Sequence, residues 1–303
     1  MRRRDLMARA AALIPACTTA FSASGPRFIK GICTAVFPSG TPYAECFTQA
    51  RNAGFEAVEV RMEDRGEIHP ESTAADMTPI ADAAAAHRLT IASLWVLTPS
   101  APSLVSPDPG VRKIALGRIR KGIELAPALR CNSLLAAPGV LGRGPRMEAT
   151  HDQAWELATS AYRAMLPLAR RAKVTISPEN VWSKFLVSPR DMRAFVDQFR
   201  SHNVKVHFDT GNVMQYGYPQ DWILTLNSRI HRIHLKDYKL SAGGVQGRFV
   251  PLLEGDVQWK DVMQALKTID YRGFVSAELG PDPQDKELLL KVSRAVDRIL
   301  AMA

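Results

Sequence analysis

The sequence predicts a single (β/α)8 barrel, also called a TIM barrel, and three observations lead to this prediction. Eight short apolar runs rich in β-branched residues alternate with eight segments of helical periodicity. Each run is nearly continuous in apolar character, as is typical of a parallel strand covered on both faces. The turn after the first run is Pro38-Ser-Gly-Thr41, whereas a doubly wound open sheet usually has a Gly-x-Gly-x-x-Gly turn there.

The apolar runs and the segments between them define the expected elements. Strands are predicted at Phe28 to Phe37, Ala57 to Met62, Leu89 to Leu97, Cys131 to Ala137, Val174 to Ser177, Val204 to Phe208, Ile230 to Leu235 and Phe274 to Ala277. Helices are predicted at Pro42 to Asn52, Ala74 to Arg88, Val111 to Leu125, Thr150 to Lys173, Pro189 to His202, Pro219 to Leu226, Trp259 to Ile269 and Pro283 to Ala301. Strand followed by helix, eight times over, is the pattern of the barrel.

Local signals support several helix ends. Thr41-Pro42 and Ser188-Pro189 each place a hydroxyl before a proline, which favours a capped helix start. Gly54 follows the first helix, where a left-handed residue often ends a helix. The proline-rich stretch Pro99 to Pro109 predicts a long loop after the third strand, so nothing divides the barrel into two domains.

Composition limits the class of protein. Hydrophobic residues make up 46% of the 303 residues and charged residues 23%, which fits a globular protein and excludes a disordered chain, a collagen or a coiled coil. The four cysteines are irregularly spaced and include no Cys-x-x-Cys pair, so we interpret them as small core residues rather than as disulfide or zinc ligands. They are Cys17, Cys33, Cys46 and Cys131.

The first 24 residues have the layout of an export signal. A basic start, a short apolar stretch and small residues at Ser22-Ala-Ser24 are typical of a secretory signal with its cleavage site. Arg3-Arg4-Asp5-Leu6-Met7 resembles the twin-arginine motif. We therefore expect residues 1–24 to be a signal, residues 25–303 to form the barrel, and the protein to be periplasmic or otherwise exported. A frayed basic helix on a cytoplasmic protein is the alternative, and lipidation at Cys17 is a poorer one.

The net charge of +9 does not indicate a nucleic-acid partner. Arg2, Arg3, Arg4 and Arg9 lie in the predicted signal together with Asp5, so the remaining chain carries +6. Its lysines and arginines are scattered, as on an ordinary solvated surface. The apolar stretch of the signal is too short to span a bilayer as a permanent helix, so no integral membrane association is expected.

Four potential metal ligands follow four consecutive strands. In a barrel of this kind the chemistry lies at the carboxyl ends of the strands, and strands five to eight end next to Glu179, Asp209, His234 and Glu278. A single acid at a strand end is usually a cap or an ion-pair partner, and a single buried histidine is usually structural. Recurrence at equivalent positions instead predicts one divalent-metal site. Three carboxylates and an imidazole without a thiolate suit Mn²⁺, with Co²⁺ or Mg²⁺ as alternatives.

These residues lie in motifs that carry a family resemblance. The motifs are Pro178-Glu-Asn-Val181, Asp209-Thr-Gly, the His-Leu-Lys-Asp run ending at Asp237, Pro251-Leu-Leu-Glu-Gly-Asp-Val257 and Gly273-Phe-Val-Ser-Ala-Glu278. From about Ile29 onward the chain resembles the xylose isomerase-like superfamily of sugar isomerases and epimerases. Within it, the chain is similar to the ketose 3-epimerase and L-ribulose-5-phosphate 3-epimerase group. The motifs are specific for the superfamily and weak on the substrate.

The resemblance implies roles for individual residues. Glu179, Asp209, His234 and Glu278 would bind one divalent metal, and the two glutamates would also move the proton. Arg248 is the counterpart of an arginine that contacts the substrate. Close ketose epimerases commonly have histidine three residues after the strand-six aspartate, whereas this chain has Asn212, which can donate a hydrogen bond but cannot carry a proton or a charge. The sugar preference therefore stays open, and a homodimer or homotetramer is the habit of the family.

The implied reaction is proton removal and return beside a ketose carbonyl. A metal that holds the carbonyl and neighbouring hydroxyl oxygens acidifies the carbon-bound proton and stabilises an enediolate. With Glu179 and Glu278 on opposite faces, one removes the proton and the other returns it, which inverts the centre. Return to the adjacent carbon would instead interconvert an aldose and a ketose.

Four more residues near strand ends are candidates for binding the sugar substrate. Lys236 could bind the substrate or pair with a carboxylate of the rim, and Asn180 follows Glu179 directly. Glu59 alternates with Val58 and Val60 and is a candidate for the barrel mouth. Trp95 offers an apolar face for a sugar, with core packing as the alternative.

Three other functions compete with this one. A 3-keto-glycoside lyase would use the same metal and base, and an exported location favours a free sugar or glycoside over a sugar phosphate. A non-catalytic sugar-binding protein is disfavoured because it needs no paired glutamates. Endonuclease IV shares this barrel, but its metal site needs histidines at the ends of strands three, four and six, and those ends have none here.

Overall fold

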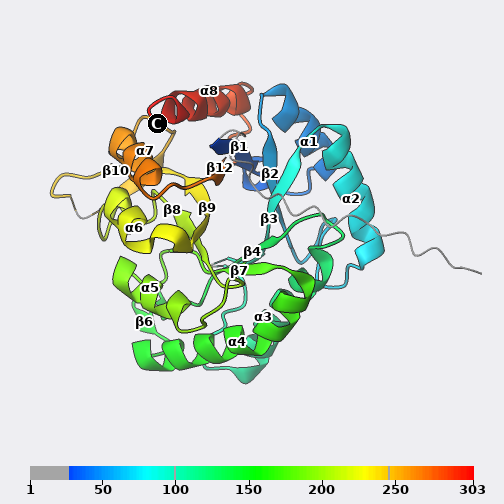
Figure 1. Cartoon of the computed structure of the whole chain (residues 1–303), viewed down its shortest axis with the longest axis vertical. Helices are drawn as coiled ribbons and strands as arrows, with labels where there is room; N and C mark the ends of the chain where they lie inside the picture. The colour runs from blue at the N-terminus through cyan, green and yellow to red at the C-terminus, as the bar shows by residue number, and fades with distance from the viewer. Residues whose placement is uncertain (1–26, 99, 245) are drawn as a thin grey trace, which may run out of the picture.

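Eight parallel strands form the centre of the molecule and helices surround them (Figure 1). The computed structural model of the chain describes residues 27–98, 100–244 and 246–303. The predicted signal, residues 1–24, and Cys17 lie outside this part. The eight strands are β1 (Phe28–Cys33), β2 (Ala57–Arg61), β3 (Thr90–Leu97), β4 (Ser133–Ala136), β7 (Thr175–Ser177), β8 (Val206–Asp209), β9 (Ile230–Leu235) and β12 (Gly273–Ala277).

The strand order is that of a barrel. The sheet runs β7-β4-β3-β2-β1-β12-β9-β8, with all neighbours parallel. Its two ends, β7 and β8, meet through isolated bridges between Ile176 and Val204 and between Glu179 and His207. The amide of His207 donates to the carbonyl of Pro178 at 2.9 Å, so the sheet is nearly closed and follows the predicted order.

A helix follows each of the eight strands, as predicted. These helices are α1 (Tyr43–Asn52), α2 (Ala74–Ala86), α3 (Pro109–Leu125), α4 (His151–Ala172), α5 (Pro189–Asp197), α6 (Pro219–Leu226), α7 (Trp259–Thr268) and α8 (Leu288–Leu300). Figure 1 shows them on the outside of the strands. Large buried side chains such as Phe47 of α1, Ile119 of α3 and Val296 of α8 fill the space between helices and sheet, which accounts for the apolar character of both layers.

Two of the three local helix signals act as predicted. The Ser188 hydroxyl accepts a hydrogen bond from the Asp191 amide at 3.1 Å, with Pro189 at the first position of α5. Gly54 follows α1 in the left-handed region, with a φ of +89°, where glycine commonly ends a helix. The Thr41 prediction was wrong, because its hydroxyl donates to the Pro38 carbonyl and leaves Pro42 as the N-cap of α1.

Several element boundaries also differ from the prediction. β1 ends at Cys33 rather than Phe37, since Thr34–Val36 form a short 3-10 helix. Helix α8 begins at Leu288 rather than Pro283, and α5 ends at Asp197 rather than His202. Two hairpins were not predicted: β5 (Gly142–Arg143) with β6 (Arg146–Met147), and β10 (Asp237–Leu240) with β11 (Gly247–Val250).

Small and polar side chains occupy much of the barrel interior. Ser93, Ser133, Ser177 and Ser276 are fully buried, together with Glu59 and His207. Barrel interiors are usually filled by bulky branched residues, so these serines leave room for charged and aromatic side chains beneath the rim. The cysteines of the described part, Cys33, Cys46 and Cys131, are buried and free, as expected.

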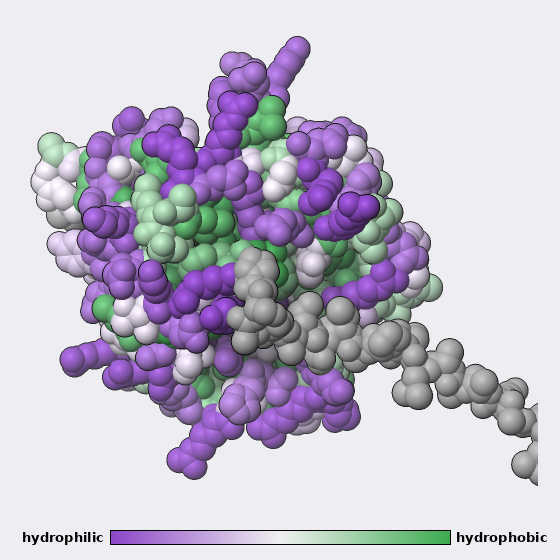
Figure 2. All heavy atoms as spheres, turned by 45° about the horizontal axis from the view of Figure 1, so that its top comes forward, coloured by the Kyte–Doolittle hydropathy of each residue, from purple (hydrophilic) through white to green (hydrophobic). Residues whose placement is uncertain are grey.

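The visible surface is mainly hydrophilic, with hydrophobic residues gathered in a hollow near its centre (Figure 2). Among the described residues, no helix is long and apolar enough to cross a membrane.

Candidate metal centre

The four predicted ligands come together at the carboxyl ends of four neighbouring strands. Asp209 ends β8 and pairs in register with His234 of β9. Glu179 lies two residues after the end of β7, and Glu278 directly follows β12. One potential ligand atom of each residue lies within 4.8 Å of the others. The parallel register therefore brings into one cluster side chains that are up to 99 positions apart in the sequence.

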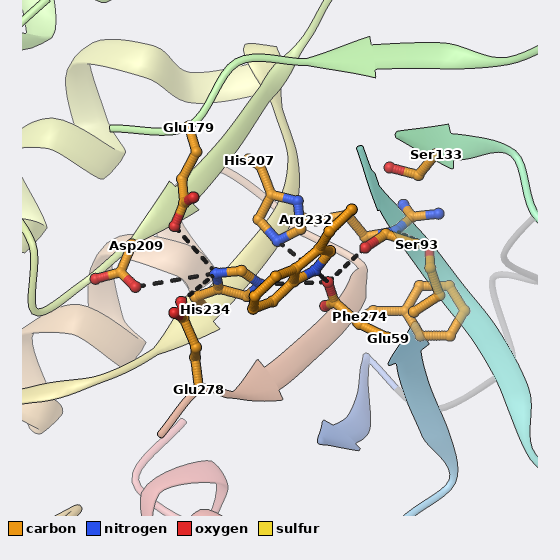
Figure 3. Close-up of polar contacts among 12 residues, drawn as sticks. Glu59, Ser93, Ser133, Glu179, His207, Asp209, Arg232, His234, Phe274 and Glu278 are labelled. Atoms are coloured by element: carbon orange, nitrogen blue, oxygen red, sulfur yellow. Dashed lines mark hydrogen bonds and ion pairs between the residues drawn. The ribbon is translucent and has the colours of Figure 1, made fainter. Parts of the chain in front are cut away.

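One nitrogen of His234 faces all three carboxylates (Figure 3). Its Nδ1 lies 2.8 Å from Glu278 Oε2, 3.2 Å from Glu179 Oε1 and 3.9 Å from Asp209 Oδ2. Asp209 Oδ2 and Glu278 Oε2 are buried without a hydrogen-bond partner in the described structure. Three largely buried carboxylates that share one imidazole need compensating positive charge, so this cluster fits a divalent cation held by three carboxylates and one imidazole.

Lys236 supplies part of that positive charge. Its Nζ lies 2.9 Å from Glu278 Oε1 and 3.2 Å from Asp209 Oδ2. Burial alone would lower the pKa of this amine, but the carboxylates of Asp209, Glu278 and Glu179 outweigh that effect and raise its pKa. Of the two roles predicted for Lys236, the structure places it in an ion pair with the carboxylates of the rim.

The two glutamates have opposite pKa shifts. Burial raises the pKa of the Glu179 carboxyl to about 7. Burial acts on Glu278 in the same direction, but the charges of Lys236 and His234 outweigh it and hold the pKa of Glu278 well below its usual range. Two nearby carboxyl groups whose pKa values diverge are suited to different roles as acid and base.

Glu59 contacts the other nitrogen of the His234 ring. Its Oε2 lies 3.2 Å from His234 Nε2 and accepts hydrogen bonds from Ser93 Oγ at 2.5 Å and Trp95 Nε1 at 2.8 Å. A carboxylate beside one ring nitrogen fixes the tautomer and leaves the other nitrogen free as a ligand. Glu59 thus lies beneath the cluster in the barrel interior, fully buried, and not at the open mouth.

Cys33 also lies within reach of Glu59 and His234, and the three could form a second ligand group. Burial raises the pKa of the Cys33 thiol far above its ordinary value. Because the thiolate is the form that binds metals, this group is less suited to a cation than the carboxylate cluster.

Asn180 and Asn212 shape the backbone around Asp209. The Asn180 side chain donates to the Asp209 carbonyl and accepts from the Asp209 amide, both at 2.8 Å. The Asn212 amide donates to Asp209 Oδ1 at 2.7 Å, and its carbonyl accepts from Trp182 Nε1 at 3.0 Å. Both residues are buried. The structure therefore gives both residues positioning contacts with or beside Asp209, through the side chain of Asn180 and the backbone of Asn212.

Trp95 and Arg248 lie in quite different surroundings. Trp95 is buried with Cys33 and Leu135 and packs at a tilt against His234, with ring centroids 5.1 Å apart. Trp95 therefore packs in the core, which was the alternative to a role in sugar binding.

Arg248 is exposed on β11 opposite Lys239, and its neighbour Phe249 contacts Lys236. Since adjacent side chains of a strand face opposite ways, Arg248 points away from the side on which Phe249 meets the cluster.

Sequence reasoning missed an aromatic pair at the rim. Trp182 and Phe249 stack with ring centroids 4.7 Å apart, and they are 40% and 41% exposed. The Lys236 amine lies 5.0 Å from the centre of the Phe249 ring. Trp182 directly follows the Pro178-Glu-Asn-Val181 motif after β7, so its position was a usable signal. Phe249 belongs to the hairpin that was not predicted.

The role of Asp237 was also missed. Its buried carboxylate accepts hydrogen bonds from the amides of Tyr238, Leu253, Gly255 and Val257 and from Trp259 Nε1. These contacts fix the loop between β11 and α7. A side chain on Gly255 would collide with this carboxylate, which explains the glycine of the Pro251-to-Val257 motif.

Comparisons with known proteins agree with this architecture. The protein named "Putative L-ribulose-5-phosphate 3-epimerase SgbU" of Escherichia coli (strain K12) is 26% identical over 263 residues, which cover 84% of this chain and 88% of that protein. A D-psicose 3-epimerase from Clostridium cellulolyticum H10, solved with D-tagatose, has a TM-score of 0.74 at 18% identity and covers 90% of this chain and 99% of its own.

A third similar protein was solved with a metal. It is a xylose isomerase-like TIM barrel protein from Mycobacterium smegmatis in complex with magnesium, with a TM-score of 0.70, 18% identity and coverage of 90% of this chain and 95% of its own. At such identities the solved structures show a shared fold. A family model described as "Xylose isomerase-like TIM barrel" matches residues 47–296, from α1 to α8. The chain therefore belongs to the xylose isomerase-like TIM barrel family.

Proposed function

We propose that this protein is an isomerase-class enzyme: a divalent-metal-dependent epimerase or isomerase of a sugar or sugar phosphate. The observation that carries the proposal is the convergence of Glu179 and Glu278 on one His234 nitrogen beside Asp209. The names of the similar proteins, an L-ribulose-5-phosphate 3-epimerase and a D-psicose 3-epimerase, support the same class of reaction.

Glu179, Asp209, His234 and Glu278 would hold the cation. Bound there, a divalent metal would supply Lewis-acid polarisation of a carbonyl and its neighbouring hydroxyl, which acidifies the proton between them. We propose Mn²⁺, with Co²⁺ or Mg²⁺ as alternatives, because carboxylate-rich sites suit these ions. The solved relative with magnesium supports a divalent ion at this kind of site.

The two glutamates would transfer the proton. Glu278, held as a carboxylate by Lys236 and His234, is suited to remove it. Glu179 has a pKa raised to about 7 by burial and is suited to return a proton from the other side of the planar intermediate. Lys236 would neutralise part of the negative charge of Asp209 and Glu278. Removal from C3 and return to C3 on the other face gives an epimer, whereas removal from C1 and return to C2 gives an aldose.

Substrate contacts are proposed on the same basis. Lys236 and Asn212 lie at the cluster, and the exposed Trp182–Phe249 pair offers an apolar surface for a sugar ring. Asn180, Glu59 and Trp95 would act indirectly, through the residues that they contact. Arg248 could reach a substrate only if the β10–β11 hairpin presented its other face.

The test is proton exchange in D₂O. The metal-loaded protein is incubated with ketoses, aldoses and keto-glycosides, and the products are followed by NMR. Deuterium at C3 is expected and identifies an epimerase, whereas deuterium at C1 or C2 identifies an isomerase. Loss of the aglycone identifies the alternative lyase. Binding without exchange of any substrate would contradict the proposal and favour a sugar-binding protein.

Glu278→Gln separates metal binding from proton transfer. The amide cannot accept the proton, so exchange should fall by about 10²- to 10⁴-fold while the variant still binds some Mn²⁺ in calorimetry. Glu156→Gln, an exposed change on α4, is the matched control and should exchange like the wild type. Exchange by Glu278→Gln at the wild-type rate would remove Glu278 from the proposed mechanism.

We further propose that residues 1–24 direct export and that residues 25–303 form the mature barrel. An exported enzyme would meet free sugars or glycosides rather than sugar phosphates. Mass spectrometry of the secreted protein tests this, because cleavage near Ser24 gives a defined mass. A homodimer or homotetramer is proposed from the family habit and is tested by light scattering.

A further inference from the structure

A groove leads away from the carboxylate cluster along α8. Its volume is about 810 Å³, and Lys236 and Glu278 of the cluster are part of its lining. Pockets of about 300–1,000 Å³ hold ligands of drug size. The groove is therefore larger than a single monosaccharide needs, and it is continuous with the candidate metal centre.

One wall of the groove is a single face of α8. Leu288, Val292, Ala295 and Arg298 line it at spacings of three or four residues, which places them on one side of a helix. At a rise of about 1.5 Å per residue, the lined face is about 15 Å long. The length indicates an extended occupant rather than a compact one.

The opposite wall is the end of β11 together with the loop that follows it. Phe249, Val250, Pro251, Leu252 and Leu253 line it. The buried carboxylate of Asp237 anchors this loop through the Leu253 and Gly255 amides. The wall is therefore apolar and fixed in place before any ligand binds, which lowers the ordering cost of binding.

The charges in the groove do not favour an anion. Arg294 and Arg298 form no ion pair with the described residues, and neither do the carboxylates of Glu254 and Asp282 in the same lining. Lys291 is already paired with Asp285 at 2.8 Å. Equal numbers of free cations and free acids give no net attraction for a phosphate, so the apolar walls decide the occupant.

We propose that the groove is a subsite for a large apolar substituent on the sugar, so that the natural substrate is a ketose unit joined to an apolar group. The inference rests on the proposed function, because the reacting ketose would occupy the carboxylate cluster. The substituent would extend from the end of the sugar remote from the reacting carbons and lie between the 249–253 loop and α8.

The experiment compares three substrates: a ketohexose, its 6-O-benzyl derivative and its 6-phosphate. The rate of deuterium exchange is measured with Mn²⁺-loaded protein, and kcat/KM is determined for each. Contact of the benzyl ring with the groove should raise kcat/KM at least tenfold over the parent sugar. Equal values for benzyl and parent sugars would overturn the subsite and leave the proposed function standing.

Ala295→Trp tests the location, because the indole would fill the groove. The ratio of the benzyl and parent kcat/KM values should fall to about one. Leu290→Trp is the matched control, since Leu290 is exposed on the same helix and does not line the groove; it should keep the wild-type ratio. An unchanged ratio in Ala295→Trp would overturn the proposal.

Two other outcomes separate the sources of error. The wild type could instead prefer the 6-phosphate, with Arg294→Ala and Arg298→Ala both losing that preference. This outcome would assign the groove to an anion and overturn the apolar subsite. If none of the three sugars exchanges, the proposed function fails, and calorimetry of the benzyl ketose decides the groove. If the wild type binds the benzyl ketose at least ten times more tightly than Ala295→Trp does, the subsite is supported. Equal binding by the two proteins would refute it.

Discussion

Glu59 is the residue whose role changes most between sequence and structure. Its alternation with Val58 and Val60 indicates only that it points to the other side of its strand. The contact that matters, 3.2 Å from His234 Nε2, joins residues 175 positions apart. Burial raises the pKa of Glu59, but the nearby His207 and His234 outweigh this and lower it well below its ordinary value, so it remains a carboxylate under the histidine.

Glu59→Gln should therefore weaken metal binding without touching a metal ligand. The amide is similar in size but lacks the charge that orients the ring, and loss of such a partner typically costs about 10- to 100-fold in metal affinity. Titration calorimetry with Mn²⁺ measures the change. Ser93→Ala removes another hydrogen bond to the same carboxylate and is the control, expected to have the smaller effect. Equal affinity in Glu59→Gln and the wild type would show that Glu59 does not position His234.

At the scale of elements, side chains at the strand ends have two roles: some form the ligand cluster and one holds a loop. Glu179, Asp209 and Glu278 converge on the cluster, whereas Asp237 turns inward and holds the loop that forms one wall of the groove. The β10–β11 hairpin then places Phe249 against Lys236 and turns Arg248 away. A residue's distance in sequence from the motif is thus a poor guide to its distance from the site.

The start of α2 gives a pH-dependent test of element stability. The Asp76 carboxylate accepts from the Thr73 amide at 2.7 Å and from the Thr73 hydroxyl at 2.8 Å, and these bonds lower its pKa below the ordinary 3.8. A carboxyl whose pKa is lower in the folded state stabilises the fold above the unfolded value. That stabilisation is lost as the pH falls through the folded value.

Asp76→Asn should accordingly lower Tm at pH 6, and the difference from the wild type should shrink as the pH falls below about 4. Thermal unfolding followed by circular dichroism at several pH values measures it. Glu56→Gln, an exposed change at a side chain that makes no hydrogen bond or ion pair with the described residues, should show no such pH-dependent difference. A Tm difference that stays constant down to pH 2 would rule out the charge of Asp76 as its cause.

At the scale of the whole molecule, the metal site depends on barrel closure. Glu179 follows β7 and Asp209 ends β8, the two strands that meet where the barrel closes. The unfolded chain cannot bring the four ligands together, so a metal that binds them binds only the folded state and stabilises it.

Mn²⁺ at 1,000 times its Kd should therefore add about 4 kcal/mol to the free energy of unfolding. At about 2 to 4 °C per kcal/mol for a protein of this size, Tm should rise by roughly 8 to 16 °C. Differential scanning calorimetry measures the shift, and a chelator should reverse it. Asp209→Asn should abolish most of the rise. The absence of any metal-dependent shift in the wild type would refute the site.

The sequence by itself determined the barrel, its eight strand–helix units and the four potential ligands. These features depend on apolar periodicity, capping and position relative to a strand end, all of which are local. It left open whether Glu59, Lys236 and Trp95 face the mouth, the core or one another.

Only the tertiary structure decided those questions. Strand register placed Glu59 beneath His234, and closure of the barrel brought β7 to β8. The two walls of the groove come from the β11–α7 loop and α8, two segments that are separate in sequence and are brought together by folding. The physical reason is that each residue's type determines which groups can ionise or bind a metal. The neighbours that shift their pKa values depend on pairings between strands, which no single segment specifies.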